Sequence, residues 1–169
     1  MDRELIEKKE RFFRGESDDA YTFMGAHRLA GRDGYVFRVW APGARSVRLA
    51  GDFNFWNTEE LFMQKDPNGV WEIESTYAKK GDCYQYYIER PDGTFVYKSD
   101  PYAFRFAPLP KTASMVWEID GYSWGDEAFR KEKWKHNPLE QPINIYELHL
   151  GSWRRREDGS FLSYEELAK

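Results

Sequence analysis

Residues 34–57 read GYVFRVWAPGARSVRLAGDFNFWN and carry the clearest strand pattern in the sequence. Over residues 35–40 and again over residues 46–50, large apolar side chains recur at alternate positions, and many of them are β-branched or aromatic. A period of two with this composition is typical of β-strands. Pro42 and Gly43 stand between the two segments and interrupt the pattern. The stretch therefore predicts two short strands separated by a turn.

The loop after the second strand, residues 51–57, sets three aromatic side chains, Phe53, Phe55 and Trp56, among polar ones. Flat apolar rings beside amide and carboxylate groups suit a sugar, which has apolar C–H faces and a polar rim. The same rings could instead close one end of a β-sandwich, because aromatic side chains are usually buried. The local pattern leaves the sugar site and the core plug as alternatives.

Further strand patterns recur at intervals of roughly ten residues, each bounded by strong turn signals. Asp66-Pro67-Asn68-Gly69 has the residues of a type I turn, with proline second and glycine fourth. Such spacing predicts an all-β, antiparallel β-sandwich. The expected additional strands cover residues 61–65, 70–75, 83–89, 94–98 and 114–119.

Charged segments flank the predicted sandwich. Residues 2–14 predict a helix that ends at Gly15 and packs as a strut on a neighbouring domain. Residues 126–136 are polar and suit a further helix, and residues 137–142 suit a linker. Residues 143–150 then predict a new strand, and Ser163 with Glu166 has the spacing of a capping box at a helix start. A strand followed by a helix is the opening of a βα unit that needs further strands, so we expect residues after 142 to begin an incomplete second domain.

These patterns divide the chain into four expected segments. Residues 1–19 form the N-terminal helix and lead-in, and residues 20–125 form the sandwich. Residues 126–142 form the linker, and residues 143–169 begin the second domain.

Composition narrows the function classes. Of 169 residues, 41% are hydrophobic and 32% are charged, as in soluble globular proteins. The net charge of −4 argues against a nucleic acid partner, which usually selects a basic surface. The sequence shows no apolar leader and no apolar run of 18 residues, so we expect no membrane partner and a cytoplasmic location. Cys83 is the only cysteine and the three histidines are far apart, so we expect no metal site and no cofactor.

The segment FRVWAPGARSVRLAGDFNFWN (residues 37–57) resembles carbohydrate-binding module family 48, the starch- and glycogen-associated module. The likeness continues through Gly69-Val70-Trp71-Glu72 and Ser99-Asp100-Pro101-Tyr102-Ala103. The later segments IYELHLGSW (residues 145–153) and LSYEELA (residues 162–168) are similar to the first strand and first helix of the α-amylase-type barrel in bacterial 1,4-α-glucan branching enzymes.

The resemblance implies an immunoglobulin-like sandwich that precedes a (β/α)8 catalytic barrel. Such an enzyme transfers an α-1,4-glucan segment to a 6-hydroxyl in glycogen biosynthesis, without a cofactor. The implied partners are an α-glucan (glycogen or maltooligosaccharides) and the catalytic barrel of the same polypeptide. The family's catalytic carboxylates follow later barrel strands, so the resemblance assigns no catalytic residue here and implies that this chain alone is inactive. Glu147 and His149 are then structural.

The resemblance also implies a sugar site. Trp56 matches the tryptophan that stacks on glucose in binding members of the module, and Asn57 follows it. Gln85 stands where those members often have a lysine, and Phe95 stands where they have a second tryptophan. The alternatives are a stand-alone glycogen- or starch-binding or regulatory module, and the N-terminal module of a debranching-type enzyme.

Overall fold

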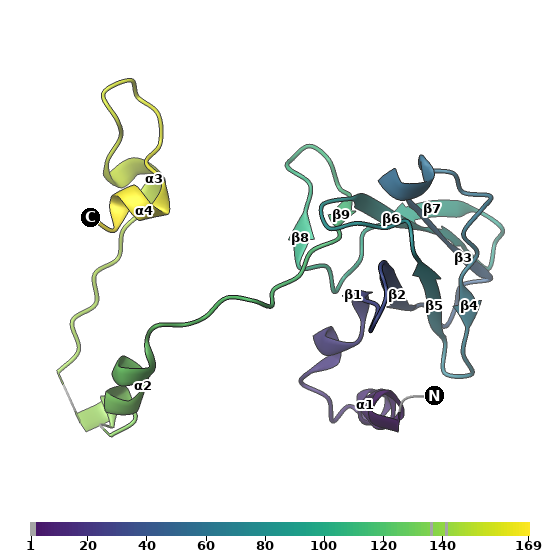
Figure 1. Cartoon of the computed structure of the whole chain (residues 1–169), viewed down its shortest axis with the longest axis horizontal. Helices are drawn as coiled ribbons and strands as arrows, with labels where there is room; N and C mark the ends of the chain where they lie inside the picture. The colour runs from purple at the N-terminus through teal and green to yellow at the C-terminus, as the bar shows by residue number, and fades with distance from the viewer. Residues whose placement is uncertain (1–2, 136, 141) are drawn as a thin grey trace. The chain divides into compact units, whose positions relative to one another are not determined.

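The computed structural model describes residues 3–135, 137–140 and 142–169, which form two compact units, Met1–Gly121 and Tyr122–Lys169 (Figure 1). The expected helices and linker also included Asp2, His136 and Gln141, which lie outside the described residues. Within the described part of the chain, no helix combines the length and the apolar character needed to cross a membrane.

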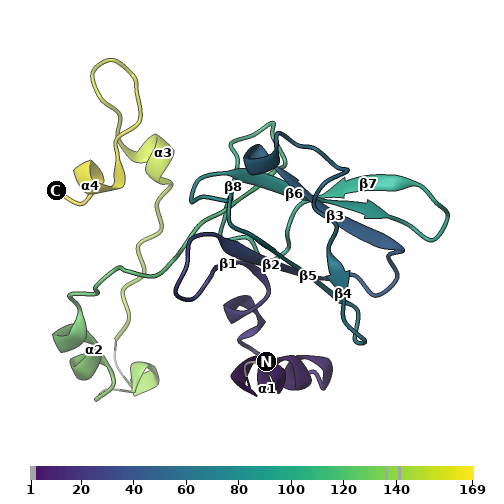
Figure 2. The same ribbon diagram turned by 45° about the vertical axis from the view of Figure 1, so that its right-hand side comes forward.

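The first unit is a sandwich of two antiparallel sheets, which confirms the fold class expected from the sequence (Figures 1 and 2). One sheet has the order β1 (Gly25–Arg28), β2 (Tyr35–Trp40), β5 (Val70–Ser75), β4 (Gln64–Lys65). The other has the order β3 (Ser46–Gly51), β6 (Cys83–Glu89), β9 (Ser114–Met115), β8 (Arg105–Phe106), with β7 (Phe95–Lys98) also paired to β6.

Strand β6 organises the second sheet. Strand β3 pairs with it from Tyr84 to Glu89, while β9 and β7 pair with its two ends at residues 83–84 and 86–89. Because successive side chains of a strand point to opposite faces, Tyr84 and Tyr86 enter the core and Gln85 faces outward. Both tyrosines are fully buried, so one strand supplies the centre of the core and the floor of an outer surface.

Two expected strands are shorter than the sequence suggests. Residues 61–65 change sheets: Leu61 and Met63 hydrogen-bond to β3, whereas β4 pairs with β5. Each half can therefore form only a short ladder. The strand expected at residues 114–119 ends at Met115 as β9, and Val116 bonds instead to the turn at Gly81 and Asp82.

A buried carboxylate lies at the centre of the core. Asp100 is fully buried, and its Oδ2 accepts hydrogen bonds from the hydroxyls of Tyr84, at 2.6 Å, and Tyr86, at 3.1 Å. Its Oδ1 accepts from the backbone N–H of Tyr102 at 2.8 Å, and its own N–H donates to Ser114 Oγ at 2.7 Å. Burial raises the pKa of the Asp100 carboxyl above its usual value. These donors offset the cost of burying the carboxylate.

Helix α1 (Arg3–Phe13) forms as expected and ends in a Schellman motif. Gly15 has φ of 72°, and the N–H groups of Gly15 and Glu16 donate to the carbonyls of Phe12 and Arg11. The expectation that this helix packs on a neighbouring domain stays a prediction. Its apolar side chains pack within the same unit, on a small cluster beside the lead-in turn η1 (Ala20–Thr22), formed by Ala20, Phe23, Met24 and Val70.

The second unit contains the short helices α2 (Glu127–Lys133), η3 (Pro138–Glu140), α3 (Leu150–Trp153) and α4 (Tyr164–Leu167). The expected helix start is confirmed, because Ser163 Oγ accepts from the Glu166 N–H and the Glu166 carboxylate accepts from the Ser163 N–H. The strand expected at residues 143–150 is wrong: residues 143–149 join no ladder, and Leu150 begins α3. A strand exists only where a neighbour pairs with it, and the described residues provide none at this segment.

Replacing the buried carboxylate tests its place in the core. Asp100→Asn turns one acceptor into a donor that faces other donors, so the free energy of unfolding should fall by about 1–3 kcal/mol near neutral pH. Glu60→Gln, at an exposed site, should change it by less than about 0.5 kcal/mol.

The same variant tests the direction of the Asp100 pKa shift through the pH dependence of stability. Because its pKa is raised on folding, Asp100 holds a proton more readily in the folded chain, and this contribution to stability is largest at low pH. The stability gap between the wild type and Asp100→Asn should widen as the pH falls from about 7 to about 4. Chemical denaturation at several pH values measures it; a gap that narrows on acidification would show that the folded pKa is lowered.

The unpaired segment of the second unit gives another prediction. Amide protons of residues 143–149 should exchange at least about a hundred-fold faster than those of β2, because no ladder protects them. Hydrogen–deuterium exchange followed by NMR measures both segments in one sample. Equal protection of the two would mean that residues 143–149 are paired in solution.

Candidate carbohydrate-binding site

The loop after β3 is held in shape by one buried amide side chain. Asn54, in the short helix η2 (Asp52–Asn54), accepts a hydrogen bond from the Gly51 N–H at 2.9 Å. Its Nδ2 donates to the carbonyls of Asn57, at 2.9 Å, and Leu49, at 3.3 Å. Three backbone groups that would otherwise lack partners are satisfied by this one side chain, so the loop has a defined conformation.

The three aromatic rings of this loop differ in how far they are buried. Phe53 packs on the core, with its ring centroid 5.7 Å from that of Phe37. Phe55 is 94% exposed, and Trp56 is half-buried. The two alternatives from the sequence therefore each hold for part of the loop: Phe53 is a core plug, whereas Phe55 and Trp56 are not.

Phe55 and Trp56 occupy the left-handed backbone region, with φ of 54° and 61°. This conformation costs a residue with a side chain roughly 1–2 kcal/mol, and such outliers suggest a functional constraint. The Trp56 N–H donates to the Gly51 carbonyl at 2.9 Å, which helps to hold the strained backbone. The turn places the indole ring outside the core.

Asp52 fixes the indole ring of Trp56 against β6. Its Oδ1 accepts from Trp56 Nε1 at 2.9 Å, and its Oδ2 accepts from the Cys83 N–H at 2.8 Å. The loop can approach β6 this closely because Gly51 has no side chain: a Cβ there would lie 2.6 Å from the Cys83 carbonyl oxygen. The ring is thus half-exposed and yet positioned.

The Trp56 ring borders a surface hollow of about 410 Å³. Gln85 lies in the same hollow, so the structure brings together two of the four site residues expected from the sequence. The Gln85 side chain donates to Thr112 Oγ1 at 3.3 Å. The full lining comprises Asp52, Trp56, Cys83, Gln85, Lys111, Thr112 and Ala113.

Sequence reasoning missed Lys111 and Thr112 as lining residues. They follow the segment Pro108-Leu109-Pro110, which carries no strand or sugar-site pattern. Their place beside Gln85 depends on the pairing of β6 with β9, a contact between distant parts of the sequence. Only the expectation of a neighbouring strand at residues 114–119 pointed to this loop.

The other two expected residues lie outside the hollow. The Asn57 side chain accepts from the Glu59 N–H at 2.9 Å and so shapes the loop. The Phe95 ring stacks on Tyr87, with centroids 5.0 Å apart and planes at 14°. The Arg48 guanidinium lies 5.3 Å from the Phe95 centroid and is ion-paired with Glu59. Phe95 therefore belongs to a separate aromatic cluster on the outer face of the sheet.

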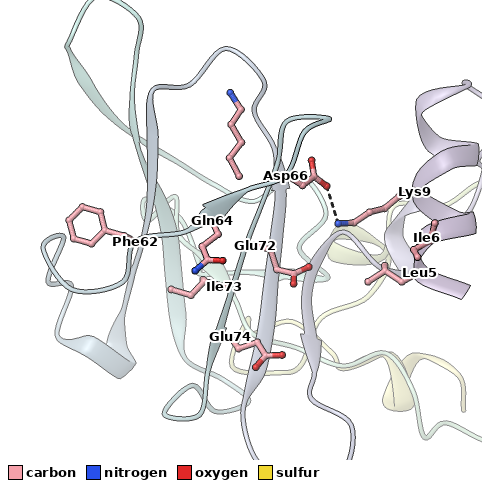
Figure 3. Close-up of a pocket in the computed structure, with 10 residues that line it drawn as sticks. Leu5, Ile6, Lys9, Phe62, Gln64, Asp66, Glu72, Ile73 and Glu74 are labelled. Atoms are coloured by element: carbon pink, nitrogen blue, oxygen red, sulfur yellow. Dashed lines mark hydrogen bonds and ion pairs between the residues drawn. The ribbon is translucent and has the colours of Figure 1, made fainter. Parts of the chain in front are cut away.

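A larger hollow, of about 640 Å³, lies between α1 and strands β4 and β5 (Figure 3). Its charged groups are mostly paired: Lys9 bonds to Asp66 at 3.1 Å, as the dashed line in Figure 3 shows, and Glu72 pairs with Arg38. Glu74 likewise pairs with Arg32. The aromatic ring in its lining, that of Phe62, already has the Arg48 guanidinium over it, 4.6 Å from the ring centroid, so we take the smaller hollow as the better candidate for a sugar.

The smaller hollow holds a thiol group that is not activated as a nucleophile. Burial, followed by the nearby Asp52 carboxylate, raises the pKa of the Cys83 thiol above its usual value, so the thiol stays protonated at neutral pH. A thiol in this state is a poor nucleophile. Among the described residues, no group of three or more His, Cys, Asp or Glu side chains could hold a metal ion.

Residues 23–103 match the family model of carbohydrate-binding module 48, described as the isoamylase N-terminal domain. The chain is 45% identical to the 1,4-alpha-glucan branching enzyme GlgB of Geobacillus stearothermophilus, over 94% of the chain and 25% of the relative. It is 40% identical to GlgB of Bacillus subtilis, over 94% of the chain and 26% of the relative. The chain thus corresponds to the N-terminal part of GlgB branching enzymes and spans about a quarter of their length.

Among solved structures, the chain is similar to a pullulanase from Bacillus acidopullulyticus, with 31% identity and a TM-score of 0.45. The match covers 56% of this chain and 12% of the pullulanase.

Two substitutions in the aromatic loop distinguish a ring that binds sugar at the surface from a ring that packs in the core. Trp56→Ala should weaken maltoheptaose binding about ten-fold, since an aromatic platform contributes about 1–2 kcal/mol. It should change the free energy of unfolding by less than about 1 kcal/mol, because the ring lies outside the core. Phe53→Ala should instead lower that free energy by about 2–4 kcal/mol.

Thermal melts and oligosaccharide titrations of both variants provide the readouts. A large loss of stability in Trp56→Ala would place its ring in the core. Unchanged binding in Trp56→Ala would move any glucan site elsewhere.

Proposed function

We propose that this module binds an α-1,4-glucan in the hollow beneath Trp56, as the N-terminal part of a glycogen branching enzyme. A glucose ring offers a flat C–H face to the indole and hydroxyl groups to a polar rim. The hollow supplies both kinds of surface, an aromatic platform and the side chains of Gln85, Lys111 and Thr112.

The observation that carries this proposal is the fixed, half-exposed indole of Trp56. A surface ring without a role needs no partner that fixes its position. The Asp52 carboxylate nevertheless accepts hydrogen bonds from both Trp56 Nε1 and the Cys83 N–H of β6, and so holds the indole in place. A platform already in place loses less conformational freedom on binding than a mobile one. The strained φ of Trp56 is consistent with a conformation kept for binding.

We expect the affinity to be low. One indole platform and an open hollow of about 410 Å³ cover little of an oligosaccharide. Weak binding of this kind suits a module whose task is to hold a long polymer near a catalytic domain, because tethering raises the local concentration of substrate.

We propose that the whole enzyme transfers an α-1,4-glucan segment to a 6-hydroxyl through a covalent glycosyl intermediate. A retaining reaction of this kind uses two carboxyl groups about 5–5.5 Å apart. By the resemblance these belong to later strands of the barrel, whose first residues would be 143–169. The exposed side chains of Ile143, Ile145 and Trp153 would then pack inside that domain. A reducing cytoplasm would suit the single free thiol of Cys83.

This proposal predicts that the chain binds glucan but does not branch it. Maltoheptaose should shift NMR signals of residues that line the hollow, while an iodine-stain assay on amylose should show no change. GlgB of Bacillus subtilis serves as the active control in the branching assay. Turnover by the purified chain would contradict the assignment of catalysis to the barrel, and absence of any glucan binding would contradict the role of the hollow.

A further inference from the structure

The polar groups of the hollow are not equally available to a ligand. Both carboxylate oxygens of Asp52 already accept hydrogen bonds, from Trp56 and from the Cys83 N–H. The Gln85 amide donates to the hydroxyl and the carbonyl oxygen of Thr112. Most of the polar lining is therefore engaged in holding the site together.

Lys111 is the exception. It is exposed, it lines the hollow, and its ammonium has no hydrogen-bond or ion-pair partner among the residues that the structure describes. Its backbone is anchored, because its N–H donates to the Pro108 carbonyl at 3.1 Å. The following residue is anchored too, since the Thr112 carbonyl accepts from Ser99 Oγ. The backbone of Lys111 is thus fixed, and its ammonium group, with three free N–H donors, lies in the same hollow as Trp56.

We propose that Lys111 is a sugar-binding residue whose ammonium donates hydrogen bonds to hydroxyls of the glucose stacked on Trp56. The side chains of positions 85 and 111 line the same hollow from β6 and from the loop before β9. The inference rests on the proposed glucan binding and adds a specific donor to it.

The test is a set of maltoheptaose titrations followed through the indole N–H signal of Trp56. Lys111→Ala should weaken binding about ten-fold, since hydrogen bonds from charged donors are stronger than neutral ones. Lys111→Arg should retain most of the affinity because it keeps the charge and the donors. Lys79→Ala, at an exposed lysine outside this hollow, should bind like the wild type.

A rescue experiment tests the equivalence of the two positions. In the Lys111→Ala background, Gln85→Lys should restore a substantial part of the lost affinity, whereas a merely structural role of Lys111 predicts no rescue. Failure of the rescue would overturn the idea that the two positions serve the same hydroxyls.

The outcomes separate this inference from the proposed function. If Trp56→Ala weakens binding but Lys111→Ala does not, the hollow is the site and the role of Lys111 is wrong. If the wild type itself shows no binding, the proposed function fails, and this inference fails with it.

Discussion

The hydroxyls of Tyr84 and Tyr86 donate to one buried carboxylate, that of Asp100, and these hydrogen bonds position strand β6 in the sandwich. They hold two fully buried side chains of β6 at the centre of the sandwich, and they make the strand a fixed reference for both of its faces. Because side chains alternate along a strand, anchoring the inward tyrosines also sets the direction of the outward Gln85. Strand β6 thus contributes side chains both to the core and, on its other face, to the candidate sugar site.

In the surface loop that carries Trp56, an aspartate carboxylate links an aromatic side chain to β6. Asp52 joins the indole to β6, and Asn54 satisfies three backbone groups of the loop. These bonds allow two aromatic residues to keep positive φ values that would otherwise be unfavourable. Phe53 turns inward and secures the loop to the core, so Trp56 can stay at the surface without loss of packing. The hydrogen bonds of Asp52 and Asn54 thereby hold an aromatic side chain in a defined position at the surface.

Periodicity and turn residues predicted most of the sandwich, because each strand with one buried face shows a period of two. They predicted the ends of α1 and α4 as well, through Gly15 and the Ser163–Glu166 box. They failed where pairing depends on distant residues: residues 61–65 switch sheets, and residues 143–149 lack a partner. In the site, the resemblance pointed to Trp56 and Gln85, whereas Lys111 carries no local signal and enters only through the pairing of β6 with β9.

We expect glucan to lie on the outer face of the sandwich, against Trp56 and beside Lys111. Intermolecular nuclear Overhauser effects between maltoheptaose and the isotope-labelled chain test it most directly. Glucose C–H protons should show contacts to the indole ring of Trp56 and to the side-chain methylene groups of Lys111. Contacts confined to the hollow beside α1, or to the second unit, would contradict it.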